Sequence, residues 1–142
     1  MEFTDPSETD IDGLARQMLR VSELAEHLGL ATLMGTEADL GTIQAILDSG
    51  TLEPDDTYDL QSLGAALGRV LIASTDGLDW AVVHDEYGSD PTLRYRNTPL
   101  CLNALTTISK RVEDGQQVDV LDLFQGLQRA LRDAIHKIGG TA

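Results

Sequence analysis

Apolar residues recur every three or four positions along the first half of the chain. This spacing is typical of amphipathic helices that pack one face on a core, and it predicts three of them. Residues 1–9 precede the pattern and are expected to form a flexible arm. The three helices are predicted over about residues 10–28, 36–48 and 58–74.

Short polar residues and glycines mark the ends of these helices. Thr9 or Asp10 is placed to cap the first helix, and Gly29 is placed to end it. Thr36 and Asp39 have the spacing of a capping box, with aspartate in place of glutamate, and predict the start of the second helix.

The hydrophobic period changes from helical to alternating after Asp76-Gly77. The next three segments are rich in β-branched and aromatic residues and are separated by short turns, which predicts three strands. Two helices follow, and Asp119 is placed to cap the last one. The strands are predicted over about residues 78–84, 92–96 and 100–104, and the helices over about residues 106–113 and 120–138.

This order of elements predicts an α+β fold. N-terminal helices are followed by a short three-stranded antiparallel meander, and the C-terminal helices pack on one face of that sheet. The chain has 142 residues and neither an internal repeat nor a linker, so one domain is expected. Within it we distinguish an acidic helical extension, residues 10–59, from an α+β core, residues 60–138.

The charge is strongly negative and unevenly distributed. The net charge is −14, of which residues 1–68 contribute −12 and residues 69–142 contribute −2. No Lys or Arg lies between Arg20 and Arg69, whereas nine Asp or Glu do. Such a potential repels nucleic acid and anionic lipid and attracts basic proteins, although charge of this kind can also serve only to keep a protein in solution.

We therefore expect a basic protein partner, and neither a nucleic-acid nor a membrane partner. The residues expected to face that partner are Glu23, Glu26, Glu37, Asp39, Asp55, Asp56 and Asp59. A cytoplasmic location is expected, because the N-terminus lacks a basic and then apolar signal and no apolar run approaches the roughly 18 residues of a membrane span. The single cysteine, Cys101, is expected to act as a small buried apolar residue.

The sequence contains no motif for catalysis, metal binding or cofactor binding. The three histidines lie on separate elements, and the HExxH, CxxC and phosphate-loop patterns are absent. A partial calcium-loop pattern begins at Glu8, but its twelfth position, which should be a bidentate glutamate, is Leu19. We therefore predict no catalytic residue, no metal ligand and no cofactor.

The strand around Trp80 carries the best hypothesis for an enzyme or a small-ligand binder. Trp80 and His84 share one face of the predicted strand, and Asp85 follows the histidine as a possible acid–base partner. The competing interpretation is a core strand that ends in an acidic turn, with Trp80 packed against a helix. The pocket hypothesis expects convergence of Trp80, His84, Asp85, Tyr87, Lys110 and Arg111.

A third hypothesis is a structural homodimer. Gly64 and Gly68 share one face of the third predicted helix, where small residues favour close packing. A second copy could use this face or an exposed edge of the sheet, so both a monomer and a homodimer are compatible with the sequence.

Several motifs occur in a familiar order between about residues 60 and 127. They are LGAALGRVL, GLDWAVVHDEYGSDPTLRY and ISKRVEDGQQVDVLDLF. In this order they resemble the bacterial family named domain of unknown function 3806. Asn103 is a departure, because a proline often precedes the Lys-Arg helix in that family. The resemblance implies a shared fold and brings no activity with it.

The charge distribution and the lack of catalytic motifs favour an interaction role. Our leading prediction is a non-catalytic acidic protein–protein interaction domain, of the kind found in immunity or antitoxin-like inhibitors of a basic partner.

Overall fold

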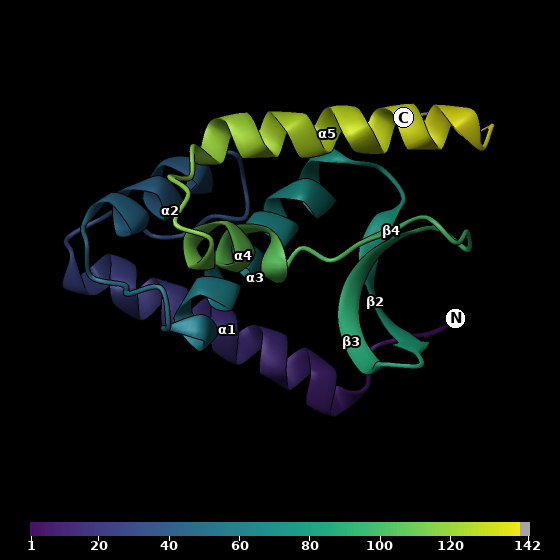
Figure 1. Ribbon diagram of the computed structural model, residues 1–142, viewed down its shortest axis with the longest axis horizontal. Helices are drawn as coiled ribbons and strands as arrows, with labels where there is room; N and C mark the ends of the chain where they lie inside the picture. Colours follow the sequence, from purple (N-terminus) through teal and green to yellow (C-terminus); the bar gives the residue numbers. More distant parts are fainter. Residues whose placement is uncertain (140–142) are drawn as a thin grey trace.

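The computed structural model describes residues 1–139, which form five helices and one four-stranded antiparallel sheet (Figure 1). The helices are α1 (Glu8–His27), α2 (Asp39–Asp48), α3 (Thr57–Ser74), α4 (Thr106–Glu113) and α5 (Val120–Lys137). The strands are β1 (Glu2–Thr4), β2 (Leu78–Asp85), β3 (Gly88–Tyr95) and β4 (Cys101–Leu102), paired in the order β1-β2-β3-β4. The predicted α+β class is confirmed.

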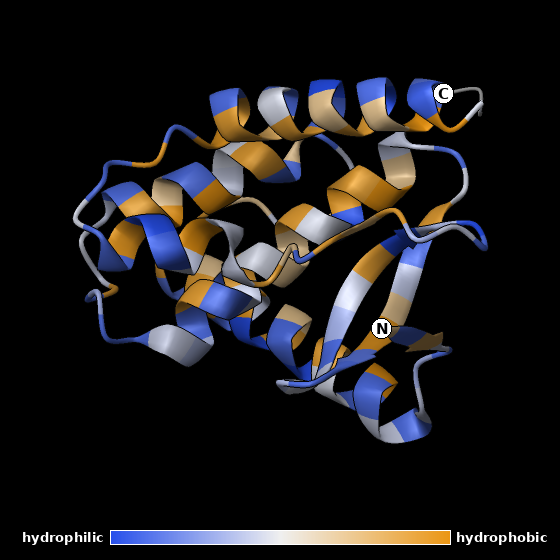
Figure 2. Ribbon diagram, turned by 45° about the vertical axis from the view of Figure 1, so that its right-hand side comes forward, coloured by the Kyte–Doolittle hydropathy of each residue, from blue (hydrophilic) through white to orange (hydrophobic). Residues whose placement is uncertain are grey.

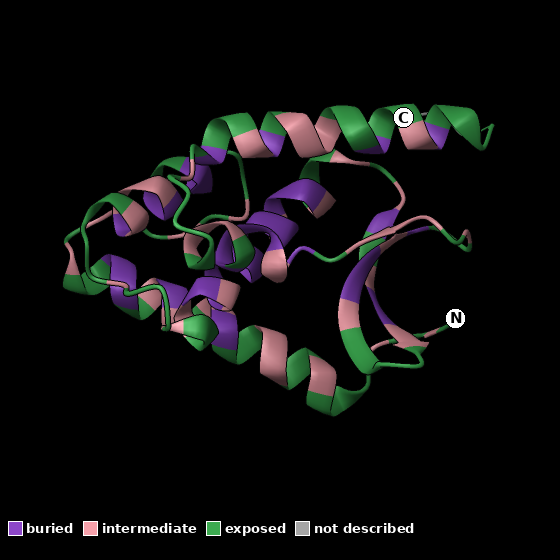
Figure 3. Cartoon of the chain, in the orientation of Figure 1, coloured by how far each residue is buried: buried purple, intermediate pink, exposed green. Residues whose placement is uncertain are grey.

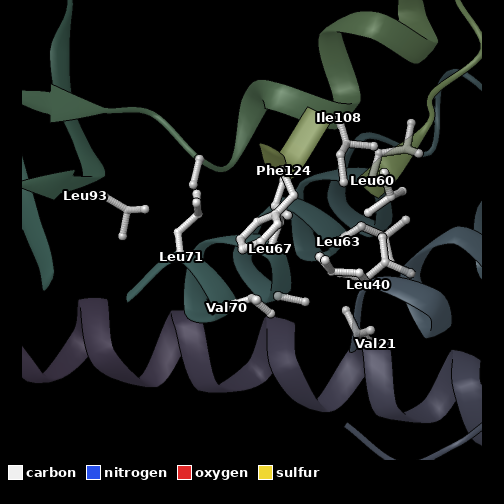
Figure 4. Close-up of a cluster of buried hydrophobic side chains, with 14 of the residues drawn as sticks. Val21, Leu40, Leu60, Leu63, Leu67, Val70, Leu71, Leu93, Ile108 and Phe124 are labelled. Atoms are coloured by element: carbon white, nitrogen blue, oxygen red, sulfur yellow. The ribbon is translucent and has the colours of Figure 1, made fainter. Parts of the chain in front are cut away.

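Helix α3 lies at the centre of the molecule. Nearly every residue from Leu60 to Leu71 is buried, and the helix is drawn mostly in the buried colour in Figure 3. A helix that is apolar or small on every side can be covered from several directions. Figure 4 shows the result: Val21 of α1 and Phe124 of α5 approach side chains of α3 from different elements. Helices α1 and α2 thus share one core with the rest of the chain.

Two glycines of α3 permit its closest contacts. A Cβ atom on Gly64 would lie 2.5 Å from the carbonyl oxygen of Leu105 and 2.6 Å from that of Ala104. A Cβ atom on Gly68 would lie 2.9 Å from Cη2 of Trp80. The predicted close packing at this face is confirmed. The hypothesis of a homodimer through the same face is wrong, because the chain itself covers both glycines.

The N-terminal residues form an edge strand rather than the flexible arm that we predicted. Strand β1 pairs antiparallel with β2, with Phe3 opposite Val83. The ring of Phe3 lies 4.3 Å below the guanidinium carbon of Arg94, and Thr4 Oγ1 forms a 2.8 Å hydrogen bond with His84 Nε2. The sheet therefore has four strands instead of three.

The buried side of the sheet faces α3. Leu78, Trp80 and Val82 alternate along β2 on the same side as Leu93 and Tyr95 of β3. The second strand was predicted to begin at residue 92, which is too late. Strand β3 begins at Gly88, directly after a two-residue turn. The third strand is also shorter than predicted.

Helix α5 covers the core from the side opposite α1 (Figure 1). Figure 2 shows its hydrophobic positions turned toward the rest of the molecule and its polar positions turned outward. Val120, Phe124, Leu131 and Ile135 are buried. The carboxylate of Asp119 accepts a hydrogen bond from the backbone N–H of Asp122 at 3.1 Å, so the predicted cap is confirmed.

The cap of α1 is Ser7, two or three residues before the predicted position. Ser7 Oγ accepts a hydrogen bond from the Asp10 N–H, and the Asp10 carboxylate accepts bonds from the Ser7 N–H and Oγ–H, both at 2.9 Å. This capping box satisfies N–H groups that lack partners inside the helix. These bonds lower the pKa of Asp10 below its ordinary value of 3.8, with the backbone bond as the largest cause.

Asp10→Asn is expected to lower the melting temperature at neutral pH. A carboxylate with a lowered folded-state pKa stabilises the protein above its ordinary pKa, and this contribution is lost as the pH falls through the folded-state value. The difference from the wild type should therefore shrink below about pH 4. Thermal unfolding followed by circular dichroism over this range tests it. Asp12→Asn is the matched control, since Asp12 is exposed on the same helix; equal effects of the two variants at every pH would contradict the assignment.

Candidate functional site

The acidic residues predicted to meet a partner lie at the end of the molecule opposite the sheet. We call this part, residues 23–59, the acidic end; it comprises the last turns of α1, all of α2, the start of α3 and the loops between them (Figure 1). Glu23 and Glu26 are exposed on α1, Glu37 is exposed before α2, and Asp55 is exposed before α3. Glu23 also accepts a 3.4 Å hydrogen bond from Arg20 Nη1, whereas Glu26, Glu37 and Asp55 form no ion pair within residues 1–139.

Asp39 is buried, and its predicted place on a docking surface is wrong. Its side chain is 1% exposed. The carboxylate accepts hydrogen bonds from the backbone N–H groups of Met34 at 2.7 Å and Gly35 at 2.8 Å, and from Arg69 Nη2 at 3.2 Å. A buried carboxylate needs such partners to offset its lost hydration. Asp39 therefore fixes the loop before α2 to α3.

Asp59 is also occupied within the chain. Its carboxylate accepts two hydrogen bonds from Arg20, at 2.7 Å from Nε and 3.1 Å from Nη2, and its side chain is only 17% exposed. This paired geometry raises the pKa of the Arg20 guanidinium. Asp56 is half-buried and accepts a bond from the Glu53 N–H at 2.7 Å. Neither carboxylate is as free as Asp55.

A large groove opens at the acidic end, between α2, the following loop and the connection from α4 to α5. We call it the acidic groove; its volume is about 1100 Å³. Seven of its 14 lining residues are apolar, three are acidic, three are glutamines and one is glycine. None of them is basic. The lining is Glu37, Leu40, Gly41, Gln44, Leu47, Asp48, Leu52, Leu60, Val112, Gln116, Gln117, Val118, Asp119 and Leu121.

Gln44 holds the two walls of the groove together. Its Nε2 donates hydrogen bonds to the backbone carbonyl of Val118 and to the Asp48 carboxylate, both at 3.0 Å. Its Oε1 accepts a bond from the Val120 N–H at 2.7 Å. One side chain of α2 thereby uses both ends of its amide to position the first residues of α5. The groove is consequently shaped before any partner arrives.

The groove has no local signature in the sequence. Gln44 and Val120 are far apart in the chain, and a glutamine on a short helix gives no local sign of its partners. Leu121 was the available signal: it is an apolar residue on the solvent side of α5 and is 53% exposed. An apolar residue out of phase with an amphipathic helix can indicate a contact outside the chain.

The strand around Trp80 does not form the predicted pocket. Neither the acidic groove nor the smaller cavity beside it, of about 410 Å³, is lined by Trp80 or His84. His84 instead bonds to Thr4 and, at 2.6 Å, to Ser89. The Trp80 ring packs near Gly68, which agrees with the competing interpretation of a core strand.

The remaining predicted pocket residues also lie apart. Asp85 ends β2 and Tyr87 lies in the β2–β3 turn; both are exposed, and the Asp85 carboxylate accepts a bond from the Tyr87 N–H at 2.9 Å. Lys110 is exposed on α4, and Arg111 donates to the Thr107 carbonyl at 2.7 Å and lines the smaller cavity. The six predicted residues are thus spread over β2, the β2–β3 turn and α4, and Arg111 alone among them lines one of the two cavities described above.

Within residues 1–139, no group of three or more His, Cys, Asp or Glu side chains is arranged to hold a metal ion. Among the helices of this part, none is long and apolar enough to cross a membrane. Cys101, predicted to be buried, is half-exposed on β4.

Most of the chain matches a known protein family. The model of the family described as Domain of unknown function (DUF3806) matches residues 39–124, which confirms the resemblance predicted from the sequence. The match includes α2, which lies in the acidic helical extension, residues 10–59, and outside the predicted α+β core. It also includes every residue of the acidic groove except Glu37.

A solved structure shares the fold. A crystal structure from Bacteroides thetaiotaomicron is similar with a TM-score of 0.79 and 20% sequence identity. The similarity covers 89% of this chain and 46% of the other, so this chain spans about half the length of that protein. None of the curated proteins matches the chain. At this identity the likeness concerns the fold alone.

Proposed function

Because the chain belongs to the family described as Domain of unknown function (DUF3806), whose description assigns no activity, we propose a function from the surface of this chain: it is a non-catalytic domain that binds a basic protein. One observation carries the proposal. The acidic end exposes Glu23, Glu26, Glu37 and Asp55, no Lys or Arg occurs between Arg20 and Arg69, and of these four carboxylates Glu23 alone contacts a base within residues 1–139, namely Arg20.

The charge arrangement favours a protein partner with a cationic surface. Exposed charges of one sign raise the encounter rate with a partner of the opposite sign and discourage partners of the same sign. Two bases border the acidic end. Arg69 is paired with the buried Asp39, and Arg20 is paired with Asp59 and also contacts Glu23 at 3.4 Å. Within residues 1–139, Glu26, Glu37 and Asp55 form no ion pair, so their negative charges act on an incoming molecule.

A more specific proposal follows from the same charge. Enzymes that act on nucleic acids or nucleotides present cationic sites, and an acidic domain can occupy such a site without any chemistry of its own. We propose that the chain acts in the cytoplasm as an immunity or antitoxin-like inhibitor of such an enzyme.

The test compares two variants with equal net charge. The immobilised full chain captures proteins from its host, and the association rate of each purified captured protein is then measured at about 50 and 500 mM salt. We expect a basic protein whose association slows about tenfold or more at high salt. We expect a similar decrease in the association rate of the acidic-end variant. That variant carries Glu23→Gln, Glu26→Gln, Glu37→Gln and Asp55→Asn.

The control variant removes four exposed carboxylates elsewhere. Both variants have a net charge of −10 instead of −14, so a difference between them reports position rather than total charge. The control should associate almost as fast as the wild type. Equal rates for the two variants, or a captured partner that is not basic, would refute the proposal. The control variant carries Asp12→Asn, Glu86→Gln, Asp90→Asn and Asp133→Asn.

A further inference from the structure

We propose that the acidic groove binds a basic, amphipathic helix of the partner protein. This inference rests on the proposed function and assigns it a binding site. Side chains at the edge of the hydrophobic core form part of the lining of the groove. Leu47, Leu52, Val112 and Val118 pack against the core and remain only half-buried, and all four line the groove. Apolar surface of this kind is stabilised when another apolar surface covers it.

The groove is large enough to accept the side chains of a chain segment, with a volume of about 1100 Å³. Leu121 stands at its edge on the first turn of α5 and is 53% exposed. An occupant with several apolar side chains along one face would cover both the floor and this edge.

The carboxylates determine the charge of that occupant. Glu37 and Asp48 lie on the α2 side of the groove, and Asp119 lies on the α5 side. With no base in the lining, an acidic or neutral occupant would gain no ion pair. Lys and Arg side chains can place their methylene groups over apolar surface while their charged ends reach these carboxylates. The occupant should therefore carry cations on both flanks of its apolar face.

The lining also favours a helix over an extended segment. All of its residues belong to helices or to the loops beside them, so no strand edge offers main-chain hydrogen bonds. An extended backbone in an apolar groove would leave N–H and C=O groups without partners, whereas a helix satisfies its own. A second copy of this chain is a poor occupant, because each copy has a net charge of −14.

The inference can be tested with a synthetic probe. The probe is a fluorescent peptide of roughly 15 Leu and Lys residues arranged so that the leucines form one helical face. Two comparison peptides are used: one has the same composition in an order that disperses the leucines, and the other has Glu in place of Lys. In fluorescence anisotropy, we expect the amphipathic cationic peptide to bind at least ten times more tightly than either comparison peptide.

One pair of protein variants locates the binding. Leu121→Gln removes an exposed apolar side chain at the groove and should weaken peptide binding about tenfold. Leu19→Gln is the matched control, because Leu19 is 63% exposed on α1 and does not line the groove. Its affinity should equal that of the wild type. The same pair is then measured with the captured basic partner, for which the same ranking is expected.

The outcomes separate this inference from the proposed function. Absence of binding by the amphipathic peptide, equal binding of the dispersed peptide, or equal affinities for Leu121→Gln and Leu19→Gln would overturn the groove as the site. If the basic partner still depends on the acidic-end carboxylates in that case, the proposed function stands without it. If sedimentation shows that wild-type chains dimerise and that Leu121→Gln prevents it, the occupant is a second copy and the inference is wrong.

Discussion

Gly64→Ala is expected to lower the free energy of unfolding by about 3 kcal/mol. The added methyl group would meet the carbonyl oxygens of Leu105 and Ala104 at 2.5 and 2.6 Å, well inside contact distance. These are backbone atoms at the entry to α4, so they cannot move aside as the end of a flexible side chain can. The helix α3 would have to shift away from the α4 connection and loosen the core between them.

Chemical denaturation of Gly64→Ala should therefore show a lower midpoint with an unchanged slope. Gly126→Ala is the matched control, since Gly126 is also inside a helix but a Cβ atom there would have no atom within 4 Å. Alanine restricts the unfolded chain and favours a helix, so this control should be neutral or stabilise by up to about 1 kcal/mol. If the two variants are equally stable, the close approach at Gly64 is not a constraint.

Asp39→Ala is expected to destabilise the protein by about 3 kcal/mol. The substitution leaves the N–H groups of Met34 and Gly35 without their acceptor and removes the partner of Arg69. Because the Arg69 side chain is 39% exposed, water can compensate it in part, which places the expected value at the lower end for a broken buried pair. Asp39→Asn keeps the shape and one oxygen acceptor and should cost less.

Hydrogen exchange gives a local measure of the same effect. The amide protons of Met34 and Gly35 should exchange faster in Asp39→Ala, while those of α5 keep their order of protection. Asp55→Ala is the control, because Asp55 is exposed at the same end of the molecule, and it should change stability by less than about 0.5 kcal/mol. A mild effect of Asp39→Ala, equal to that of the control, would contradict the assigned role of this carboxylate.

Elements with strong local signals were predicted well. Helix α4 has the predicted bounds, residues 106–113, and α5 begins after its predicted cap, Asp119. In both helices, the spacing of the apolar residues and the residues that mark the helix ends indicate the same bounds. Helix α1 was found with the wrong cap because Ser7, Thr9 and Asp10 are all good capping residues within four positions. Ser7 is the cap, and Asp10 is its partner three residues later in a capping box.

The strands show where local signals are insufficient. Gly88 and Pro91 made the start of β3 look like part of a turn, but the register with β2 extends the pairing to Gly88. Strand β1 is only three residues long and forms by pairing with residues about 80 positions away. A segment this short has no period of its own. Its structure depends on an edge that exists only after the hairpin has folded.

The acidic end was visible in the chain, since a stretch without bases can be counted directly. The sequence also determined the fold class, the helices with clear periods, the close packing at Gly64 and Gly68, and the absence of catalytic motifs, because each depends on residue type and local spacing. Only the tertiary structure decided which carboxylates are free. Asp39 and Asp55 look alike in the sequence. Asp39 is buried and paired with Arg69 of another helix, whereas Asp55 faces solvent.

The acidic groove was likewise decided by tertiary structure, because Gln44 joins α2 to residues more than 70 positions later. Burial and pairing are properties of positions brought together in space. They depend on contacts between elements that no local pattern in the chain specifies.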